Sequence, residues 1–411
     1  MHDWMFGFGH QPFIDNKCPV TNCYITNKRD NLCKYIFDLI YYFVVFENNW
    51  SPESNIVIYI FTFSAINEFD AVMFHIRDMN DGHIALPNRK KRRRNQRYVM
   101  FLMESPKNDG FPYEKFNDFF NWTMTFRLDS DFPNPYGWVE PINSAFIGPP
   151  SHGNFPDLNY NIKTERNEEE LALLENLREK TSKKQKLVAW MVSNCNTHSQ
   201  REHYVKELRK HIPVDIYGGC GKLKCKRTDG DKCMQHINDQ YKFYLSFENS
   251  VCNDYVTEKF WNPLSLESVV PVVLGAGNYS RMAPTNSFID AQSFDSPAKL
   301  AEHLLYLDKN FDEYSKHLLW KTKFQVKSNN HNLAICKICQ ELNNPNAKTK
   351  SYSDMKEWWR GGGDCKSKGD FQWSPKESSF SLTGLFEDAR KTIFDGAGEV
   401  FEKLRDSKVI V

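Results

Sequence analysis

The clearest hydrophobic pattern in the chain lies between residues 241 and 275. Residues 241–247 alternate aromatic and apolar side chains, which is typical of a half-buried strand, and a polar turn follows. From about Val256 apolar residues recur at helical spacing, and residues 269–274 are β-branched and strand-like. This order predicts a parallel strand–helix–strand unit, which binds ligands beyond the carboxyl ends of its strands. The polar residues expected at that edge are Glu248, Asn249, Tyr255, Glu258 and Lys259.

Other apolar runs repeat the same α/β order. The pattern predicts strands at 71–76, 98–103, 187–192 and 214–217, and helices at 199–211, 297–308 and 311–320. The highly charged segment 164–185 carries leucines on one helical face, which predicts an exposed connecting helix and a domain boundary. Beyond about Asn343 the pattern weakens, and a final amphipathic stretch at 382–404 completes what we expect to be a loosely attached tail.

Residues 31–66 have a different character. Two continuous apolar and aromatic runs, 36–46 and 56–63, flank a polar turn. They predict either two buried strands or an insertion foreign to the surrounding domain. The first run contains Asp38 and is too short to span a bilayer.

Composition and charge exclude several functional classes. With 411 residues the chain is long enough for two domains, and its net charge of +1 predicts neither a nucleic-acid nor an acidic partner. The basic run 89–94 lacks interleaved aromatic residues, so an exposed loop is favoured over a nucleic-acid site. Aromatic residues, at 14%, offer platforms for sugars, although core packing accounts for most of them.

Cysteines and glycosylation sequons favour an oxidising, secretory compartment. The chain has 11 cysteines, and Asn121 and Asn278 each begin an Asn-X-Ser/Thr sequon. Cys336 and Cys339 lack a second pair at zinc-site spacing, which favours a disulfide or free thiols. No signal peptide or anchor is evident near Met1, and we expect the targeting segment to lie upstream of this chain.

Two groups of polar residues are candidates for chemistry in the first half of the chain. Glu104 follows a predicted buried strand, where a carboxylate suits catalysis but serves equally well in a loop or a helix cap. Arg127, Asp129 and Asp131 alternate with apolar residues, which indicates a solvated face or a site for a hydroxyl-rich ligand.

Four segments, in this order along the chain, resemble the α1,3-fucosyltransferases. They read FLMESP, FNWTMTFRLDSDFPNPYG, VSNCNTHSQREHYVKEL and FYLSFENSVCNDYVTEKFWNPL, the last leading to VPVVLG. The resemblance covers about residues 67–342. It implies an α/β fold of GT-B type, in which two Rossmann-like domains face a central cleft.

The resemblance also implies the division of the chain. Residues 1–165 would form the acceptor-side domain, 166–185 the connecting helix, 186–345 the domain that binds GDP-fucose, and 346–411 a C-terminal extension. Members of the family have a shorter spacing where residues 31–66 stand here, which favours the insertion. The CxxC of Cys336 and Cys339 resembles one that belongs to a disulfide arrangement in the family.

Carried over residue by residue, the resemblance implies the site. Glu104 would be the general base, and Arg201 and Lys259 would contact the donor diphosphate. The other donor-binding positions would be Asn249, Tyr255 and Glu258. No metal ligand is implied, and Asp129-Ser130-Asp131 is assigned no metal although it is spelled like a metal-binding motif.

The implied activity is inverting transfer of L-fucose from GDP-β-L-fucose to the 3-OH of GlcNAc in glycoprotein glycans. Core α1,3-fucosylation of N-glycans is slightly favoured; Lewis-type outer-arm transfer and a non-catalytic glycan-binding protein of the same fold stay alternatives. No cofactor is expected beyond the donor substrate, and stimulation by a divalent cation stays open. Family members are Golgi membrane proteins with a signal anchor, so a lumenal, disulfide-bonded glycoprotein is expected.

Overall fold

The structure is a computed structural model that describes residues 6–26, 43–48, 69–79, 87, 89–143, 156–161, 165–225, 229, 231–329, 331–371 and 373. Contacts divide the chain into two units, Met1–Phe371 and Gln372–Val411. Of the second unit only Trp373 is described, so the amphipathic stretch predicted at 382–404 lies outside the described residues. All helices and strands given below belong to the first unit.

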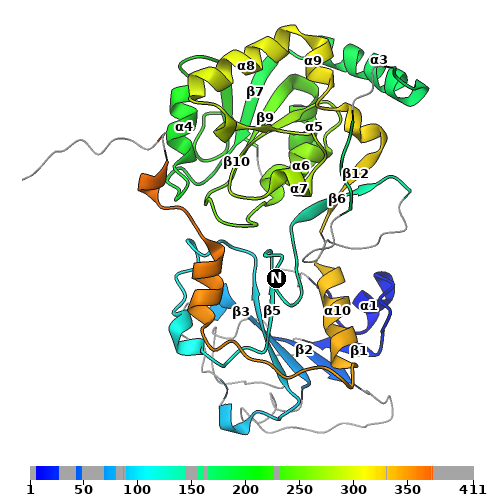
Figure 1. Ribbon diagram of the computed structural model, residues 1–411, viewed down its shortest axis with the longest axis vertical. Helices are drawn as coiled ribbons and strands as arrows, with labels where there is room; N and C mark the ends of the chain where they lie inside the picture. Colours follow the sequence, from blue (N-terminus) through cyan, green and yellow to red (C-terminus); the bar gives the residue numbers. More distant parts are fainter. Residues whose placement is uncertain are drawn as a thin grey trace, which may run out of the picture. The chain divides into compact units, whose positions relative to one another are not determined.

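The first sheet, in the lower part of Figure 1, has five strands, and their order is β1-β2-β3-β4-β5. They are β1 (Cys23–Thr26), β2 (Phe43–Asn48), β3 (Ala71–His75), β4 (Arg97–Leu102) and β5 (Trp122–Thr125). β3, β4 and β5 are parallel, whereas β2 is antiparallel to both of its neighbours, β1 and β3. Every residue of β4 is buried, as expected of a parallel strand covered on both faces. β2 comes from segment 31–66, most of which lies outside the described residues.

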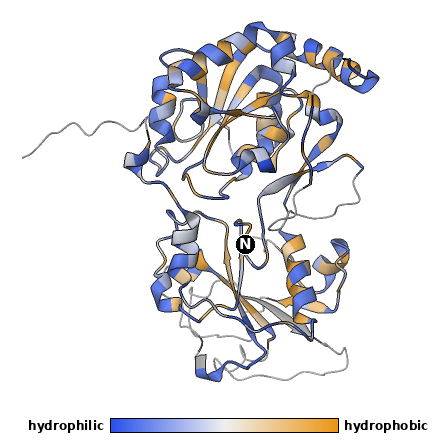
Figure 2. Ribbon diagram, viewed as in Figure 1, coloured by the Kyte–Doolittle hydropathy of each residue, from blue (hydrophilic) through white to orange (hydrophobic). Residues whose placement is uncertain are grey.

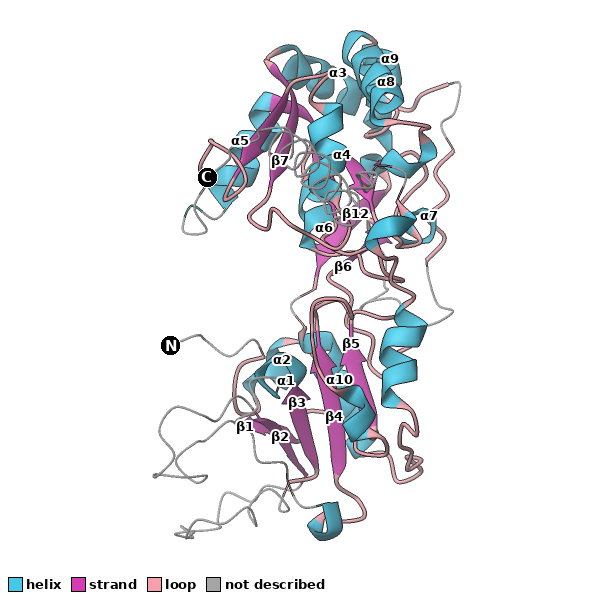
Figure 3. Ribbon diagram, turned by 90° about the vertical axis from the view of Figure 1, so that its left-hand side faces the viewer, coloured by secondary structure: helices cyan, strands magenta, loops and turns pink. Residues whose placement is uncertain are grey.

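The second sheet is entirely parallel, in the order β11-β10-β9-β7-β8. Its strands are β7 (Lys186–Met191), β8 (Val214–Tyr217), β9 (Tyr241–Phe247), β10 (Val270–Leu274) and β11 (Ile289–Asp290). Helices α4 (Arg201–Leu208), α5 (Asp231–Gln240), α6 (Glu258–Ser265) and α8 (Pro297–Lys309) flank it (Figure 3). α4 packs against α8, while α5 and α6 pack on β9. The α/β order predicted from the hydrophobic pattern is confirmed.

Shorter elements complete the unit. They are α1 (Gln11–Asp15), α2 (Ile76–Met79), β6 (Gly137–Pro141), α3 (Glu168–Ser182), α7 (Tyr279–Met282), α9 (Phe311–Ser315), β12 (Phe324–Ser328), α10 (Asn332–Leu342) and a π-helical turn at Glu357–Gly361. Short 3₁₀ turns lie at Arg89–Lys91, Tyr113–Phe116, Ala291–Ser293, Leu319–Thr322 and Lys368–Asp370. α3 begins with a capping box between Asn167 and Glu170, as its acidic first turn favours. In Figure 2 the strands of the second sheet are mostly hydrophobic, whereas the helices around the sheet are more hydrophilic.

Disulfides fix distant parts of the sequence to each other. Cys18 bonds to Cys336 and Cys23 to Cys339, so the CxxC of α10 holds the N-terminal segment. This confirms disulfides rather than a zinc site. Three further bridges join Cys195 to Cys220, Cys225 to Cys233 and Cys252 to Cys365.

The prediction of a loosely attached tail is wrong for residues 346–371. Met355 and Trp359 are fully buried and pack in the core of the first sheet. Cys365 is covalently bound to Cys252. The segment is held by a few large side chains at irregular spacing, which leaves no periodic pattern to detect in the sequence.

Candidate active site

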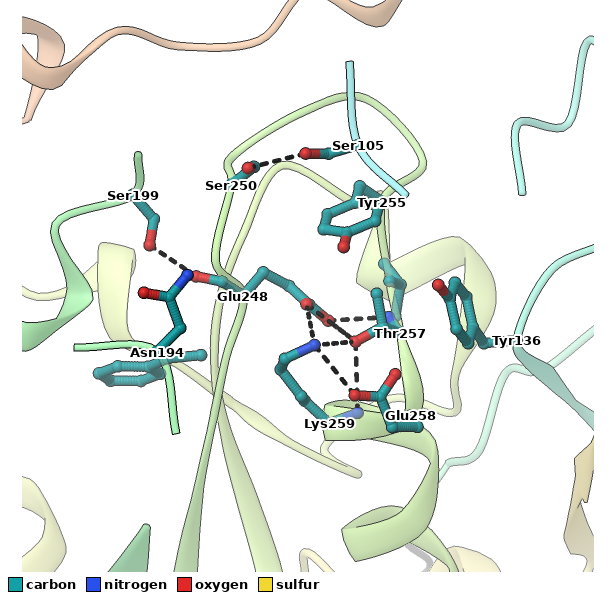
Figure 4. Close-up of polar contacts among 12 residues, drawn as sticks. Ser105, Tyr136, Asn194, Ser199, Glu248, Ser250, Tyr255, Thr257, Glu258 and Lys259 are labelled. Carbon is teal, nitrogen blue, oxygen red and sulfur yellow. Dashed lines mark hydrogen bonds and ion pairs between the residues drawn. The ribbon is translucent and has the colours of Figure 1, made fainter. Parts of the chain in front are cut away.

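An ionic cluster lies where β9 ends and α6 begins (Figure 4). The Glu248 carboxylate is fully buried and accepts hydrogen bonds from the Thr257 amide at 2.8 Å and from its hydroxyl at 2.9 Å. Thr257 is also the N-cap of α6, so one side chain both starts the helix and holds the carboxylate. Lys259 Nζ lies 3.4 Å from Glu248 and 3.0 Å from the half-exposed Glu258.

These carboxylates keep Lys259 charged. Burial lowers the pKa of Lys259, but the charges of Glu248 and Glu258 raise it by more, so the net pKa lies above the ordinary lysine value. The ammonium is therefore a fixed cation at the carboxyl end of a parallel sheet. Such a group suits a phosphate or diphosphate ligand.

Glu104 lies just beyond β4, and its Oε1 is held by three donors. Tyr255 donates its hydroxyl at 2.7 Å, Ser105 its amide at 2.9 Å and Asn108 its side-chain amide at 3.2 Å. In the described part of the chain, no hydrogen bond reaches Oε2. Burial raises the pKa of Glu104, but these hydrogen bonds and the charge of Lys259 together lower it by more, so the net pKa lies below the ordinary glutamate value. An ionised carboxylate with one oxygen available has the arrangement required of a general base.

The loops after β4 and β9 meet directly. Ser105 Oγ donates to Ser250 Oγ at 2.8 Å in a buried contact, which Figure 4 shows above Tyr255. Together with the bond from Tyr255 to Glu104, this contact joins the strand ends of the two sheets. The structure thus brings the predicted base and the predicted donor residues into one site.

Several buried polar atoms in this region have no hydrogen-bond partner within the described residues. They are Asn249 Oδ1, Gln200 Oε1, Arg201 Nε and Tyr279 Oη. Buried polar atoms are nearly always paired, so atoms left over at the strand ends of a parallel sheet indicate where a polar ligand binds.

The Arg201 guanidinium is hydrogen-bonded to backbone carbonyl groups rather than being free to bind a phosphate. It is the first residue of α4 and is buried, and its Nη1 donates to the Phe247 carbonyl at 2.5 Å. Its Nη2 lies 3.4 Å from the Asn194 carbonyl. The guanidinium thus supports the loops after β7 and β9, and its contact with a diphosphate stays a prediction.

The polar residues after β5 mostly hold their own loop. Arg127 Nε donates to Asp129 at 2.9 Å, and Asp131 accepts from the Thr123 amide at 2.9 Å. Arg127 is buried, so the solvated face expected from the alternation is wrong at this residue.

Sequence reasoning missed Asn108 and Ser250 as site residues. Asn108 donates both to Glu104 and to Ser250, the latter at 3.2 Å. The one indication in the sequence was the position of each residue. Both lie in a loop that follows a predicted strand and that contains a predicted site residue. Polar type and loop position alone do not distinguish such residues from ordinary loop residues.

Comparison with known families places this architecture. The family model "Fucosyltransferase, N-terminal" matches residues 58–137, and "Glycosyltransferase family 10 (fucosyltransferase) C-term" matches residues 181–358. The first range contains β3, β4 and β5, and the second contains the whole second sheet.

Three relatives with curated names indicate the family of this chain more closely. Glycoprotein 3-alpha-L-fucosyltransferase A of Drosophila melanogaster is 30% identical over 89% of this chain and 60% of its own length. Alpha-(1,3)-fucosyltransferase C of the same organism is 35% identical, covering 72% of this chain and 66% of the relative. Human 4-galactosyl-N-acetylglucosaminide 3-alpha-L-fucosyltransferase FUT6 is 38% identical, covering 66% and 67%. The chain belongs to glycosyltransferase family 10, the fucosyltransferases.

The chain spans 60% of the length of the first of these relatives and about two thirds of the others. Among solved structures, a crystal structure of an α1,3-fucosyltransferase with GDP-fucose has a TM-score of 0.40 and 16% sequence identity. That match covers 69% of this chain and 80% of the other.

Proposed function

We propose that the protein transfers L-fucose from GDP-β-L-fucose to the 3-OH of GlcNAc in glycoprotein glycans, with inversion at the anomeric carbon. The observation that carries this proposal is the Glu104 carboxylate, held through one oxygen beside the donor residues Tyr255 and Lys259. A sugar hydroxyl is barely acidic, so its attack needs a carboxylate within hydrogen-bond reach to take the proton. Oε2 of Glu104 is the atom that takes it.

The donor-side groups stabilise the departing diphosphate. As the bond to fucose breaks, the sugar takes on oxocarbenium character and GDP gains negative charge. Lys259 and the amino terminus of α6, capped at Thr257, present positive charge at the strand ends of the second sheet. Asn249 and Glu258 supply acceptors for the hydroxyl groups of the donor. This scheme routes no step through a metal ion.

A glycoprotein acceptor is supported by the extent of similarity. The Drosophila glycoprotein 3-alpha-L-fucosyltransferase A matches 89% of this chain, whereas the human enzyme named for 4-galactosyl-N-acetylglucosaminide matches 66%. Within glycoprotein glycans we propose the core GlcNAc of N-glycans as the acceptor, and outer-arm lactosamine is the alternative.

The test is direct. The purified protein, given GDP-fucose and defined N-glycans, is expected to release GDP and add one fucose to the innermost GlcNAc, as read by mass spectrometry of the products. Fucose on outer-arm lactosamine would instead support the Lewis-type alternative. Binding of glycans with neither GDP binding nor GDP release would support the non-catalytic alternative.

The acid limb of the activity should report the hydrogen bond from Tyr255. Glu104 works as a base only when ionised, and its lowered pKa keeps it ionised to lower pH, so kcat/KM should fall only at a pH below the ordinary titration range of glutamate. Tyr255→Phe removes a donor that lowers this pKa, and we expect the acid limb to move to higher pH by about one unit. A pH profile of kcat/KM measures the shift; an unchanged limb would contradict the assignment of Glu104 as base.

We further propose that the protein acts in the Golgi lumen and is attached to the Golgi membrane. None of the described helices is both long and apolar enough to cross a membrane. The five disulfides among the described residues support an oxidising compartment.

The sequons at Asn121 and Asn278 differ in access, which predicts a glycan at only one of these two positions. Asn121 is buried, accepts from the Tyr98 amide at 2.9 Å and donates through Nδ2 to the Lys350 carbonyl at 2.8 Å. Asn278 is exposed and caps α7 through Oδ1, so a glycan on its Nδ2 leaves the cap intact. After secretory expression, peptide mapping with peptide N-glycosidase should find a glycan on Asn278 and none on Asn121. A glycan on Asn121 would contradict this prediction.

A further inference from the structure

The C-terminal segment 352–366, here called the strap, contacts the loop that carries Glu104. The Asp109 carboxylate, in that loop, is buried and accepts from Trp359 Nε1 at 2.5 Å and from Arg360 at 3.2 Å. Tyr113 donates to the same carboxylate at 2.9 Å. The strap is therefore attached to the end of the loop that begins with Glu104.

The strap also packs closely on the loop after β5. The buried Arg127 donates to the Trp359 carbonyl at 3.2 Å, and its guanidinium lies 4.7 Å from the ring centroid of Trp358. A Cβ at Gly362 would clash with Arg127 Nη2, so a residue larger than glycine would displace the guanidinium. This fit indicates one defined position for the strap.

On the donor side, the strap is bound to the loop after β9. Cys365 forms a disulfide with Cys252, and the Lys366 amide donates to the Val251 carbonyl at 2.9 Å. The Asn253 amide donates to the Gly363 carbonyl, also at 2.9 Å. Tyr255, which bonds to Glu104, follows Cys252 by only three residues.

We propose that the strap is a positioning element of the active site, which holds the loops after β4 and β9 together so that Tyr255 donates to Glu104. This inference rests on the proposed function, in which Glu104 is the base. Trp359 acts on the loop of Glu104 through Asp109, and the Cys252–Cys365 bridge acts on the loop of Tyr255, so all three are positioning residues. The bond from Tyr255 to Glu104 joins loops of two different sheets, and a loop of this kind keeps its position only where other contacts fix it.

The strap could instead contribute only to overall stability, and the pH profile separates the two roles. A purely stabilising strap changes the amount of folded protein and leaves the acid limb of kcat/KM in place. A positioning strap changes the hydrogen bond that lowers the pKa of Glu104. Tyr136 and Lys259 also face Glu104, and neither residue is substituted in the strap variants.

The experiment compares the Cys252→Ala/Cys365→Ala double variant with Cys225→Ala/Cys233→Ala, which removes the bridge between the segment after β8 and α5. We expect the first variant to lose about tenfold in kcat and to move the acid limb up by about one pH unit, as Tyr255→Phe does. The control variant should keep both values. In a Tyr255→Phe background, loss of the Cys252–Cys365 bridge should move the limb no further.

If the double variant fails to fold, Trp359→Phe serves in its place, because it keeps a buried ring and removes only the donor to Asp109. An acid limb that stays in place in the folded strap variant, or an effect additive with Tyr255→Phe, would overturn the proposal.

Hydrogen exchange distinguishes failure of the strap from failure of the proposed function. Amide exchange in residues 105–109 and 250–255 should rise in the strap variant and stay unchanged in the control, whether or not the protein transfers fucose. Unchanged exchange would overturn the strap as a positioning element. If the wild-type protein had no transferase activity, the proposed function would be overturned. The exchange result alone would then decide whether the strap is a positioning element.

Discussion

Replacing Glu104 by glutamine is expected to lower the kcat of fucosyl transfer by about 10²–10⁴-fold. Glutamine has the same shape, and its carbonyl oxygen can still accept from Tyr255 and Ser105. The amide cannot take a proton at the other position, where the acceptor hydroxyl must be deprotonated. Initial rates of GDP release with saturating donor and acceptor measure this loss.

Two further measurements give this result its meaning. Affinity for GDP, measured by calorimetry, should stay close to that of the wild type, because Glu104 belongs to the acceptor side. Glu114→Gln, at an exposed position of the same part of the chain, should keep full activity. Full transfer by Glu104→Gln would show that another group is the base.

Replacing Lys259 by methionine is expected to weaken GDP binding by about 30-fold or more. The ammonium is held between Glu248 and Glu258 and is the cation that we assign to the diphosphate. Calorimetric titration with GDP measures the loss. Lys299→Met removes an exposed ammonium that pairs with Glu302 in α8, and should leave GDP affinity unchanged.

The same substitution should also lower stability, because it leaves the fully buried Glu248 without its cation. Breaking a buried pair in this way costs about 3 kcal/mol of unfolding free energy. Adding Glu248→Gln should restore part of the stability but none of the GDP affinity. Wild-type GDP affinity in Lys259→Met would remove this residue from the donor site.

The strand–helix–strand unit at 241–275 was predictable because each of its elements has its own hydrophobic period. β9 and β10 lie within one residue of the expected ranges. The helix begins at Glu258 rather than near Val256, because Thr257 has extended backbone and caps it. Periodicity marks where apolar side chains recur, whereas the first turn is set by a single capping side chain.

The site was only partly predictable. Glu104 could be singled out because a strand end fixes its place in the chain. The hydrogen bond between Glu104 and Tyr255 could not be predicted, because the two residues are 151 positions apart in sequence and lie in loops of different sheets. The strap was missed for the same reason: Trp359 is buried by tertiary contacts, without any helical or strand pattern around it.

The bridges from Cys18 to Cys336 and from Cys23 to Cys339 also govern how the protein can be made. The paired cysteines are 318 and 316 positions apart in sequence, so α10 must be synthesised before the two bridges to the N-terminal segment can form. The first sheet is therefore not a module that can be expressed from its own stretch of sequence. A recombinant fragment that stops between the two sheets would carry Cys18 and Cys23 as unpaired thiols. It would also lack the apolar face of α10, which covers the core of the first sheet.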